Sequence, residues 1–383
     1  MKNLSKRKIV VAMSGGIDSS VAAALLKRAN FSVSGVFMKL ADLPRFRESE
    51  KRARKVAKIL KIPFYVFNFE KEFKKRIVDY FLDGHRKGIT PNPCVVCNKE
   101  IKFGLLLEKA LKMDADFIAT GHYARKHGLT TNNLQPTTYK LLKAKDKEKD
   151  QSYFLWQFNQ KQLKHILFPI GDYTRKDVEN VARKFKLPVL KAKKSVEICF
   201  IQTTIVDELR SSSRTSSLGR VRKNFNSFDF ASARVNDFLK KYLKPKPGKI
   251  IDTQGKVIGE HEGIYFYTIG QRKGIGLPGG PYWVLDKDFK KNALIVTKNE
   301  KDLYRKELIA KNVNWISGKI PKLPLKIRAK IRYRHQPALA IITKTLTPKT
   351  YTLKFYKPQR AITPGQSVVF YRGKELLGGG IIY

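Results

Sequence analysis

Acidic residues are scarce in this chain of 383 residues, which has 32 Asp and Glu against 78 Lys and Arg, a formal net charge of 78 − 32 = +46 at pH 7. So few carboxylates cannot neutralise the cations through ion pairs, and a strong positive field remains. We therefore expect a polyanionic partner. Nucleic acid is preferred to an anionic membrane surface, because no polybasic stretch borders an apolar helix. A lysine-rich proteome is a third source of such an excess.

Cysteine and long apolar runs are also lacking. Three cysteines cannot form a disulfide scaffold, and one must stay unpaired in any scheme, so we expect a reduced, cytoplasmic setting. No stretch approaches the roughly 18 consecutive apolar residues that a membrane-spanning helix requires. The basic start MKNLSKRK leads into an apolar run from about Lys8, so no cleavable targeting peptide is expected.

The first third of the chain alternates between strand and helix patterns. A content of 42% hydrophobic residues is enough to form substantial cores. The expected elements, in order, are Lys8–Met13, Ser19–Arg28, Phe31–Met38, Glu48–Leu60, Ile62–Phe67 and Asp116–Thr120. This rhythm predicts an α/β fold with a doubly wound parallel sheet, whose ligands bind beyond the carboxyl ends of the strands.

Shifts in composition predict four segments. Residues 1–201 are the expected catalytic domain, and 202–235 a basic Ser/Arg-rich insertion or linker that includes SSSRTSS (Ser211–Ser217). Weak periodicity from Gln202 to Ala233 predicts a loop there. Residues 236–285 are expected to form a small β-rich central domain. Alternating runs in 286–383 predict a C-terminal antiparallel β-barrel.

Ser14–Ser20 (SGGIDSS) follows the first strand and opens the first helix. Two glycines permit a tight turn, and the backbone amides of a helix N-terminus bind anions. No lysine completes the GxxxxGKS/T pattern, so transfer of a γ-phosphoryl group is not predicted. The segment instead resembles the pyrophosphate loop of the ATP-pyrophosphatase (PP-loop) superfamily, whose members adenylate a substrate oxygen. A carboxylate beside phosphates, here Asp18, indicates a ligand for Mg²⁺.

The three cysteines are Cys94 and Cys97, in the segment TPNPCVVCNKEIKF, and Cys199 in SVEICFI. A helix pattern that begins near Cys97, with lysines nearby, predicts a lowered thiol pKa. A thioredoxin-like redox pair is disfavoured because CVVC does not open the first βαβ unit. Two other interpretations stay open besides inert buried thiols: a metal or Fe–S site that uses all three, and a nucleophile paired with a sulfur carrier.

Eight motifs in one order give the chain a resemblance to the bacterial tRNA-specific 2-thiouridylases, a family of the PP-loop superfamily. The match extends almost from end to end. The motifs are Ser14–Ser20, Thr90–Phe103, Ala119–Arg125 (ATGHYAR), Lys149–Leu155 (KDQSYFL), Glu197–Phe200 (EICF), Tyr267–Gly276 (YTIGQRKGIG), Arg332–Arg334 (RYR) and Thr363–Gln366 (TPGQ).

The resemblance implies an ATP-dependent tRNA-uridine 2-sulfurtransferase. ATP, with Mg²⁺, would adenylate the 2-oxygen of the anticodon wobble uridine in tRNAs such as those for Lys, Glu and Gln. Sulfur from a Cys199 persulfide would then replace that oxygen, with Cys97 as nucleophile, to give 2-thiouridine, AMP and pyrophosphate. A transient Cys97–Cys199 disulfide would be reduced afterwards. The implied partners are tRNA and a cysteine desulfurase or sulfur-relay protein, with no membrane.

The resemblance also assigns roles residue by residue. The implied catalytic residues are Cys97, Cys199 and Asp18. The implied ATP-binding residues are Ala12, Met13, Ser14, Gly15, Gly16, Ile17, Asp18, Ser19, Met38 and Gly121. The implied contacts with the target base and the tRNA are Asn92, Pro93, Cys94, His122, Lys149, Asp150, Gln151, Arg332, Tyr333 and Gln366. Flipping of the base and stacking on aromatic side chains fit such a set.

Three features depart from the family. Cys94 stands where many relatives carry Asp, which leaves it open as a base contact or a cluster ligand at Cys94, Cys97 and Cys199. Lys194 stands where an acidic residue is expected, and Gln202–Arg234 is an insertion. That insertion is either a surface excursion or a change in how the sulfur donor docks.

Three kinds of function compete with the thiouridylase. Another ATP-dependent tRNA thiolase, or an Fe–S-dependent one, stays open. A tRNA-binding protein without activity is disfavoured by the intact loop and thiols. A methyltransferase is disfavoured because no ribose-binding acid follows the first loop.

Overall fold

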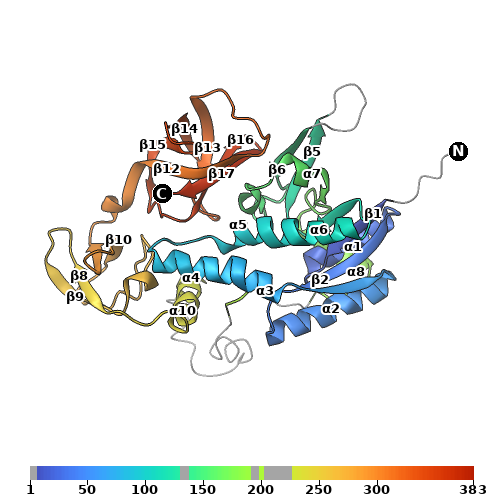
Figure 1. Ribbon diagram of the computed structural model, residues 1–383, viewed down its shortest axis with the longest axis horizontal. Helices are drawn as coiled ribbons and strands as arrows, with labels where there is room; N and C mark the ends of the chain where they lie inside the picture. The colour runs from blue at the N-terminus through green and yellow to red at the C-terminus, as the bar shows by residue number, and fades with distance from the viewer. Residues whose placement is uncertain (1–6, 130–137, 191–197, 202–226) are drawn as a thin grey trace.

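The fold is α/β with a C-terminal barrel, as the sequence predicts. The computed structural model describes residues 7–129, 138–190, 198–201 and 227–383, and it gives an N-terminal α/β unit, a central sheet and an antiparallel barrel (Figure 1). Within those ranges no helix combines the length and the apolar character needed to cross a bilayer.

The N-terminal sheet has five strands, all parallel, in the order β3-β2-β1-β4-β7. Their bounds are β1 (Lys8–Ala12), β2 (Ser32–Lys39), β3 (Phe64–Asn68), β4 (Phe117–Thr120) and β7 (Ile166–Leu167). The first residues after β1 and β4 therefore emerge side by side at the carboxyl edge. This is the edge where ligands of doubly wound sheets bind.

Helices cover both faces of this sheet because successive side chains of a buried strand point to opposite sides. Ile9 and Val11 of β1 pack in one buried cluster, whereas Val10 and Ala12 pack in another. The first cluster includes α1 (Ile17–Arg28), α2 (Pro44–Leu60) and α8 (Arg175–Lys184). The second includes α3 (Glu70–Phe73), α4 (Asp79–Arg86), α5 (Pro93–Cys97) and α6 (Leu106–Lys112), with π-helical turns η1 (Lys74–Val78) and η2 (Asn98–Leu105) between them.

The barrel is closed by six antiparallel strands, with a pairing between β12 and β17 completing the ring. Its strands are β12 (Tyr304–Trp315), β13 (Leu325–Lys330), β14 (Ala338–Lys344), β15 (Tyr351–Arg360), β16 (Ser367–Arg372) and β17 (Glu375–Ile382). A hairpin of β5 (Ala124–Leu129) and β6 (Thr138–Lys143), which the sequence did not predict, lies in the N-terminal unit. Strand β6 pairs with β17 and so continues the barrel sheet into the N-terminal unit.

The central sheet and the helix before it begin or end at other residues than predicted. It is formed by β8 (Gly248–Ile251), β9 (Val257–His261), β10 (Trp283–Asp288) and β11 (Ala293–Thr297). Strand β10 crosses the predicted break between residues 285 and 286, so this sheet extends to Thr297. Helix α10 (Ser227–Lys240) begins inside the stretch predicted as a loop, while residues 202–226 lie outside the described residues.

The 3₁₀ turn η3 (Ser152–Leu155) and the residue after it join the N-terminal unit to the barrel through buried hydrogen bonds. Tyr153 donates its hydroxyl to the carbonyl of Ser367 at 2.8 Å, and Trp156 donates its indole N–H to the hydroxyl of Ser367 at 3.1 Å. Helix α7 (Gln160–Lys164) follows this turn, and Gln160 donates its amide to the carbonyl of Ile316, just after β12, at 2.6 Å.

Leu155 at the end of η3 provides a test of the packing. Its side chain is fully buried in the same cluster as Val10 and Ala12 of β1, whereas Leu346 is fully exposed. Leu155→Ala should therefore lower the free energy of unfolding by about 2–5 kcal/mol, because transfer and cavity costs add. The matched Leu346→Ala should stay within about 0.5 kcal/mol of the parent. Urea unfolding followed by tryptophan fluorescence measures both, and equal effects would contradict this packing.

Candidate functional site

The phosphate loop lies at the carboxyl end of β1, as predicted, and two of its contacts demand glycine. Gly15 has φ +72°, and a Cβ there would lie 2.1 Å from the carbonyl oxygen of Ser49 on α2. Gly121 follows the neighbouring strand β4, and a Cβ there would lie 2.4 Å from the backbone nitrogen of Ser19. Backbone atoms cannot yield at such distances. The loop is therefore held between α2 and the end of β4.

The backbone amides at the N-terminus of α1 have no side-chain cap and could bind an anion. The N-cap of this helix is Gly16. The hydroxyls nearby are turned inward: Ser19 donates to the carbonyl of Gly16 at 3.1 Å and accepts from the backbone N–H of Ser14 at 3.1 Å. With the glycine loop folded this way, the orphan amides of the first turn are left for a phosphate group. Met38, near the end of the adjacent β2, lies at the same edge.

Asp18 is held by two partners that the sequence analysis did not identify. Its Oδ1 accepts hydrogen bonds from the hydroxyl of Tyr123 at 2.9 Å and from a guanidinium nitrogen of Arg175 at 3.1 Å. Burial raises the pKa of the Asp18 carboxyl, while Arg175, Tyr123 and Lys149 act in the opposite direction. Both hydrogen bonds described for this side chain fall on Oδ1. A single carboxylate with phosphates is sufficient to bind Mg²⁺, so Asp18 fits that role.

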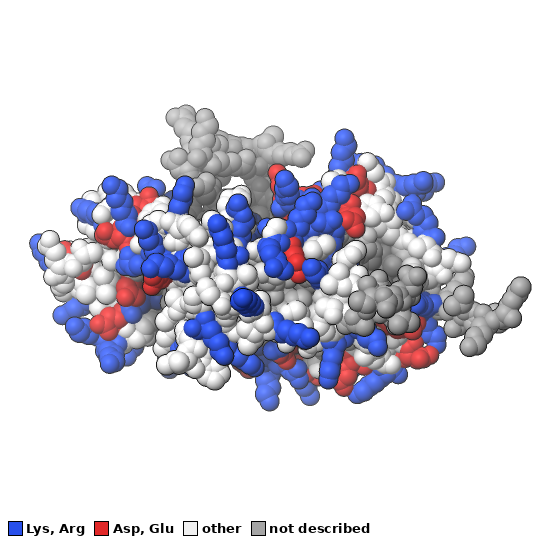
Figure 2. Space-filling model, turned by 90° about the horizontal axis from the view of Figure 1, so that it is seen from above, with Lys and Arg blue, Asp and Glu red and all other residues white. Residues whose placement is uncertain are grey.

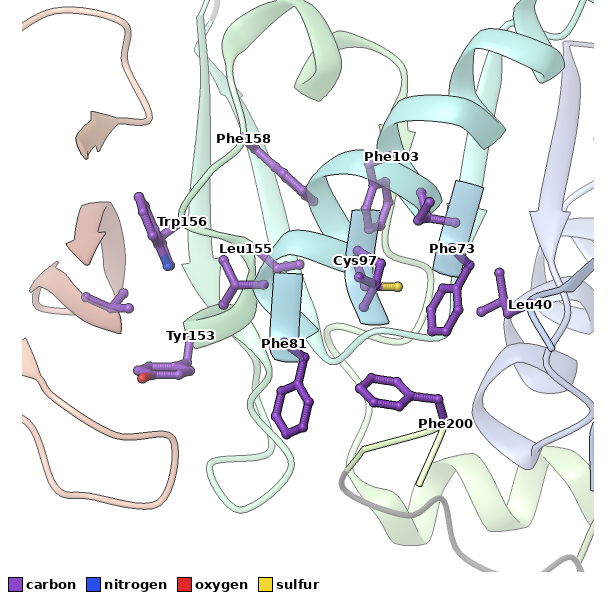
Figure 3. Packing of buried hydrophobic residues seen from close by; sticks show 14 of the residues in the cluster. Leu40, Phe73, Phe81, Cys97, Phe103, Tyr153, Leu155, Trp156, Phe158 and Phe200 are labelled. Atoms are coloured by element: carbon purple, nitrogen blue, oxygen red, sulfur yellow. The ribbon is translucent and has the colours of Figure 1, made fainter. Parts of the chain in front are cut away.

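The position of Cys97 in its helix, and the pKa of its thiol, differ from the prediction. The helix begins at Pro93 rather than near Cys97, so the thiol lies beyond the first turn and loses most of the benefit of the helix dipole. Cys97 is only 6% exposed, in the same cluster as Phe73, Phe103 and Leu155 (Figure 3). Burial raises the pKa of the thiol to about 12, although Lys102 favours the thiolate. The predicted lowering of the Cys97 pKa is therefore wrong, because desolvation exceeds the effect of the nearby charge.

The segment that carries Cys199 is docked beside Cys97. Phe200 packs edge-on against Phe73 and Phe81, at ring-centroid distances of 5.9 and 5.5 Å. Negative charge on Cys199 raises the pKa of Cys97, so the two thiols are close enough for their charges to interact. In Figure 3 the Cys97 sulfur is directed toward the side where Phe73 and Phe200 lie. Cys199 itself is exposed.

The same cation, Lys102, affects the pKa of both thiols. Lys102, on the π-helical turn just after Cys97, lowers the pKa of Cys97 and of Cys199, and it also acts on the ring of His122. His122 follows Gly121 of the phosphate site in sequence. Helix α2 provides a second link, since Arg45 donates to the carbonyl of Ile201 at 2.9 Å while Ser49, one turn later, contacts Gly15. The thiols and the phosphate loop therefore share one end of the sheet.

The three thiols are not grouped as a metal site in this structure. Within the described part of the chain, no three or more Cys, His, Asp or Glu side chains are grouped so that they could hold a metal ion. Cys94 is half-buried, Cys97 is buried and Cys199 is exposed, and within the described residues none of the three forms a disulfide. Their arrangement in this conformation is not that of an Fe–S cluster ligand set.

The residues before Cys94 are held by contacts from several elements. The side chain of Asn92 hydrogen-bonds the hydroxyl of the buried Tyr153. Gln366, in the barrel loop, donates its amide to the carbonyl of Thr90 at 2.9 Å. Tyr333 packs on Phe154 at a centroid distance of 4.5 Å. Tyr333 and Gln366 thus contact the N-terminal unit close to Asn92 and Pro93, and the resemblance assigns all four residues to tRNA contact.

Four other residues assigned to tRNA contact are engaged internally. His122 is 8% exposed, and its Nδ1 hydrogen-bonds the Thr120 hydroxyl at 2.8 Å. Asp150 is 8% exposed and accepts from the hydroxyl of Ser152 at 2.8 Å. Gln151 accepts from the backbone N–H of Tyr123 at 3.0 Å. Arg332 spans to the central domain by donating to the carbonyl of Ile269 at 3.2 Å. In this conformation these side chains position the loops, and their contact with RNA stays a prediction.

Lysine and arginine side chains extend over the surface. Figure 2 shows them spread from one end of the visible face to the other, whereas Asp and Glu form smaller groups. A distribution of this kind suits a long polyanion better than a small one. The excess of 46 positive charges is thus spread over the surface that Figure 2 shows and is not confined to one small patch.

Family comparisons cover the whole fold. Residues 7–203 match the family described as a tRNA methyl transferase HUP domain. Residues 236–298 match the tRNA methyl transferase PRC-barrel domain, and residues 305–382 match the aminomethyltransferase beta-barrel domain.

Curated relatives match from end to end. A protein of Moorella thermoacetica named tRNA-specific 2-thiouridylase MnmA is 43% identical, over 97% of this chain and 98% of that protein. A protein of the same name from Clostridioides difficile is 40% identical, over 98% of both chains.

Among solved structures, the U34-tRNA thiolase NcsA from Methanococcus maripaludis, with its 4Fe–4S cluster, matches at a TM-score of 0.34 and 15% identity, over 64% of this chain and 76% of that chain. The NMN synthetase from Francisella tularensis matches at a TM-score of 0.32 and 14% identity, over 62% of this chain and 86% of that chain. Likenesses this low carry no argument about the site.

The burial of Cys97 predicts a difference in alkylation. With a pKa of about 12, its thiol is almost entirely protonated at pH 8. Iodoacetamide should therefore modify Cys97 at least about 100-fold more slowly than an ordinary thiol, since the thiolate is the nucleophile. The rate should rise with pH as long as the fold persists. Peptide mass spectrometry resolves the cysteines, and urea-unfolded protein is the control. Rapid modification of Cys97 at pH 8 in the folded protein would contradict the buried, protonated thiol.

Proposed function

The chain belongs to the tRNA-specific 2-thiouridylase family, and from this premise we propose that it replaces the 2-oxygen of the wobble uridine of its tRNA with sulfur in an ATP-dependent reaction. Members of this family are tRNA sulfurtransferases, so the protein is an enzyme. One observation carries the detailed proposal: Cys97 and Cys199, far apart in sequence, lie with interacting charges at the end of the sheet that also holds the phosphate loop.

The first step activates the base. The 2-oxygen of uracil is a poor leaving group, so it attacks the α-phosphorus of ATP and pyrophosphate departs. The amides of the α1 N-terminus and the glycine loop would hold the phosphates, with Asp18 as the carboxylate that binds Mg²⁺. Mg²⁺, when bound, would neutralise the phosphate charge. Arg175, hydrogen-bonded to Asp18 at 3.1 Å, orients that carboxylate and adds positive charge beside the departing pyrophosphate.

The target base would enter between the catalytic unit and the barrel. A base must leave its stack before chemistry can reach its ring carbon. The segment Asn92–Cys94 lies next to the barrel loop through the contact of Gln366 with Thr90. Asn92 offers an amide for the base edge, and Tyr333 an aromatic face for an unpaired base. Both belong to the implied tRNA set.

The second step transfers sulfur. A donor protein, a cysteine desulfurase or a relay protein, first supplies a persulfide on the exposed Cys199. The outer sulfur then attacks carbon 2 of the adenylated base and AMP leaves, while the Cys97 thiolate attacks Sγ of Cys199. Alternatively, Cys97 attacks first and the released hydrosulfide attacks carbon 2. In either order the outer sulfur gains two electrons, Cys97 and Cys199 become a disulfide, and a cellular thiol must reduce it before the next cycle.

Serine variants test the roles of the two thiols. Cys97→Ser and Cys199→Ser should each abolish 2-thiouridine, because one loses the nucleophile and the other the sulfur carrier. Binding of tRNA should persist, since neither thiol supplies charge to the RNA surface. Nucleoside analysis of tRNA incubated with protein, ATP, Mg²⁺ and a sulfur donor measures the product, and filter binding measures the affinity.

Cys94→Ser is the matched control for these variants. It should retain measurable product, because the persulfide route needs only two thiols. If Cys94→Ser were as inactive as the other two, with iron in the anaerobically purified protein, a three-thiol cluster would replace the proposed persulfide route.

The affinity for tRNA should depend steeply on salt. Neutralising each phosphate releases condensed counterions, so Kd should rise by more than about tenfold between 50 and 200 mM KCl. Filter binding at constant pH measures this slope. A salt-independent Kd would mean that the positive surface in Figure 2 is not the tRNA-binding surface.

A further inference from the structure

Arg45 connects the first turn of α2 to the segment that carries Cys199. Pro44 opens this helix at its first position, and Arg45 follows it. One terminal guanidinium nitrogen of Arg45 donates to the carbonyl of Ile201 at 2.9 Å, across 156 positions of sequence. This carbonyl lies two residues after Cys199. The contact fixes the guanidinium beside the docked Cys199 segment.

The rest of this guanidinium has no described partner. Its Nε and its second terminal nitrogen are buried and lack any hydrogen-bond partner in the part of the chain that the structure describes. A guanidinium carries five N–H donors, and leaving buried donors of a charged group unpaired is costly. The ring of Phe46, 5.7 Å from the guanidinium carbon, offers only a weak cation–π contact. The arrangement is suited to an anion that is not always present.

Cys199 is the group whose negative charge, when present, would act on Arg45. Burial lowers the pKa of Arg45, and the only described charge that raises it is that of Cys199. In the other direction, Arg45 and Lys102 both lower the pKa of the Cys199 thiol, against desolvation that raises it. Lys102 belongs to the π-helical turn after Cys97 and Arg45 to α2, so cations from two elements act on the Cys199 sulfur. An outer sulfur bonded to Cys199 would extend about 2 Å beyond Sγ and carry the negative charge.

We propose that Arg45 is a positioning residue that holds the outer sulfur of the Cys199 persulfide through its two unpartnered nitrogens. This inference rests on the proposed sulfur-carrier role of Cys199. Two parallel N–H donors suit a single anionic atom and fix the direction in which it points, which a lysine ammonium would do less well. The sulfur is thereby kept at the docked segment until Cys97 and the activated base are both in place.

The test compares full-length Arg45→Met, which removes the charge and keeps the length, with Arg45→Lys, which keeps the charge without the fork. Arg47→Met is the matched control, because Arg47 lies two residues along the same helix in an exposed ion pair with Asp42 at 2.8 Å. Each protein is loaded with sulfur from a cysteine desulfurase. The persulfide on Cys199 is then trapped by alkylation and followed by mass spectrometry. Arg45→Met should shorten its lifetime at least about fivefold, Arg45→Lys less, and Arg47→Met not at all.

A second measurement separates charge from mere docking. If Arg45 stabilises negative charge on Cys199, Arg45→Met should raise the thiol pKa by about one unit, a tenfold slower alkylation at fixed pH. If Arg45 only fastens the segment, its loss would expose the thiol and move the pKa down toward the ordinary value. A fall or no change, or an unaltered persulfide lifetime, would overturn the inference. If the parent protein takes up no sulfur on Cys199, the proposed function fails instead, and the two failures are distinct.

Discussion

The packing of Phe200 into the aromatic cluster is the contact on which the chemistry depends. It holds the Cys199 segment against the helices that carry Phe73, Phe81 and Cys97. Burying a phenylalanine contributes about 2–3 kcal/mol, and each favourable ring pair adds about 1 kcal/mol. Ordering the backbone costs about 1–2 kcal/mol per residue, so fixing the four described residues 198–201 costs a comparable amount. The contribution of Phe200 therefore roughly balances the cost of ordering the segment, a balance that the proposed sulfur-carrier role of Cys199 would require.

Much of the architecture follows from the sequence, because the N-terminal strands are continuous apolar runs and the helices between them are periodic. The hairpin of β5 and β6 escaped prediction for a physical reason. Its strands are only partly buried, and the contact that fixes them is the pairing of Leu142 with Glu375, across more than half the chain. Helix α10 was missed because serine-rich composition before it masked the periodicity. Its Phe238 packs on Phe200, so tertiary contact stabilises it.

The candidate site shows a similar division. Glycine positions were predictable because close backbone approach leaves no alternative, as at Gly15 and Gly121. The partners of Asp18 were not, because Tyr123 and Arg175 come from other elements and neither residue type is rare. The Cys97 pKa was predicted in the wrong direction because a sequence displays nearby lysines but not the depth of burial. Electrostatics can be read from sequence only where desolvation is small.

The two thiols differ in exposure, and the proposed mechanism gives them different tasks. Cys199 is exposed, as a thiol that meets a donor protein would need to be, and Lys102 and Arg45 lower its pKa against the larger effect of desolvation. Cys97 is buried and has a pKa of about 12, so its thiol is protonated at neutral pH. Attack requires a thiolate, and the adjacent Lys102 is the group that stabilises it once the local packing changes. In the proposed mechanism, sulfur release by Cys97 would therefore require a rearrangement of the same core that holds Phe200. The simplest source of that rearrangement is the entry of the flipped base between the catalytic unit and the barrel, where the segment before Cys94 contacts Gln366.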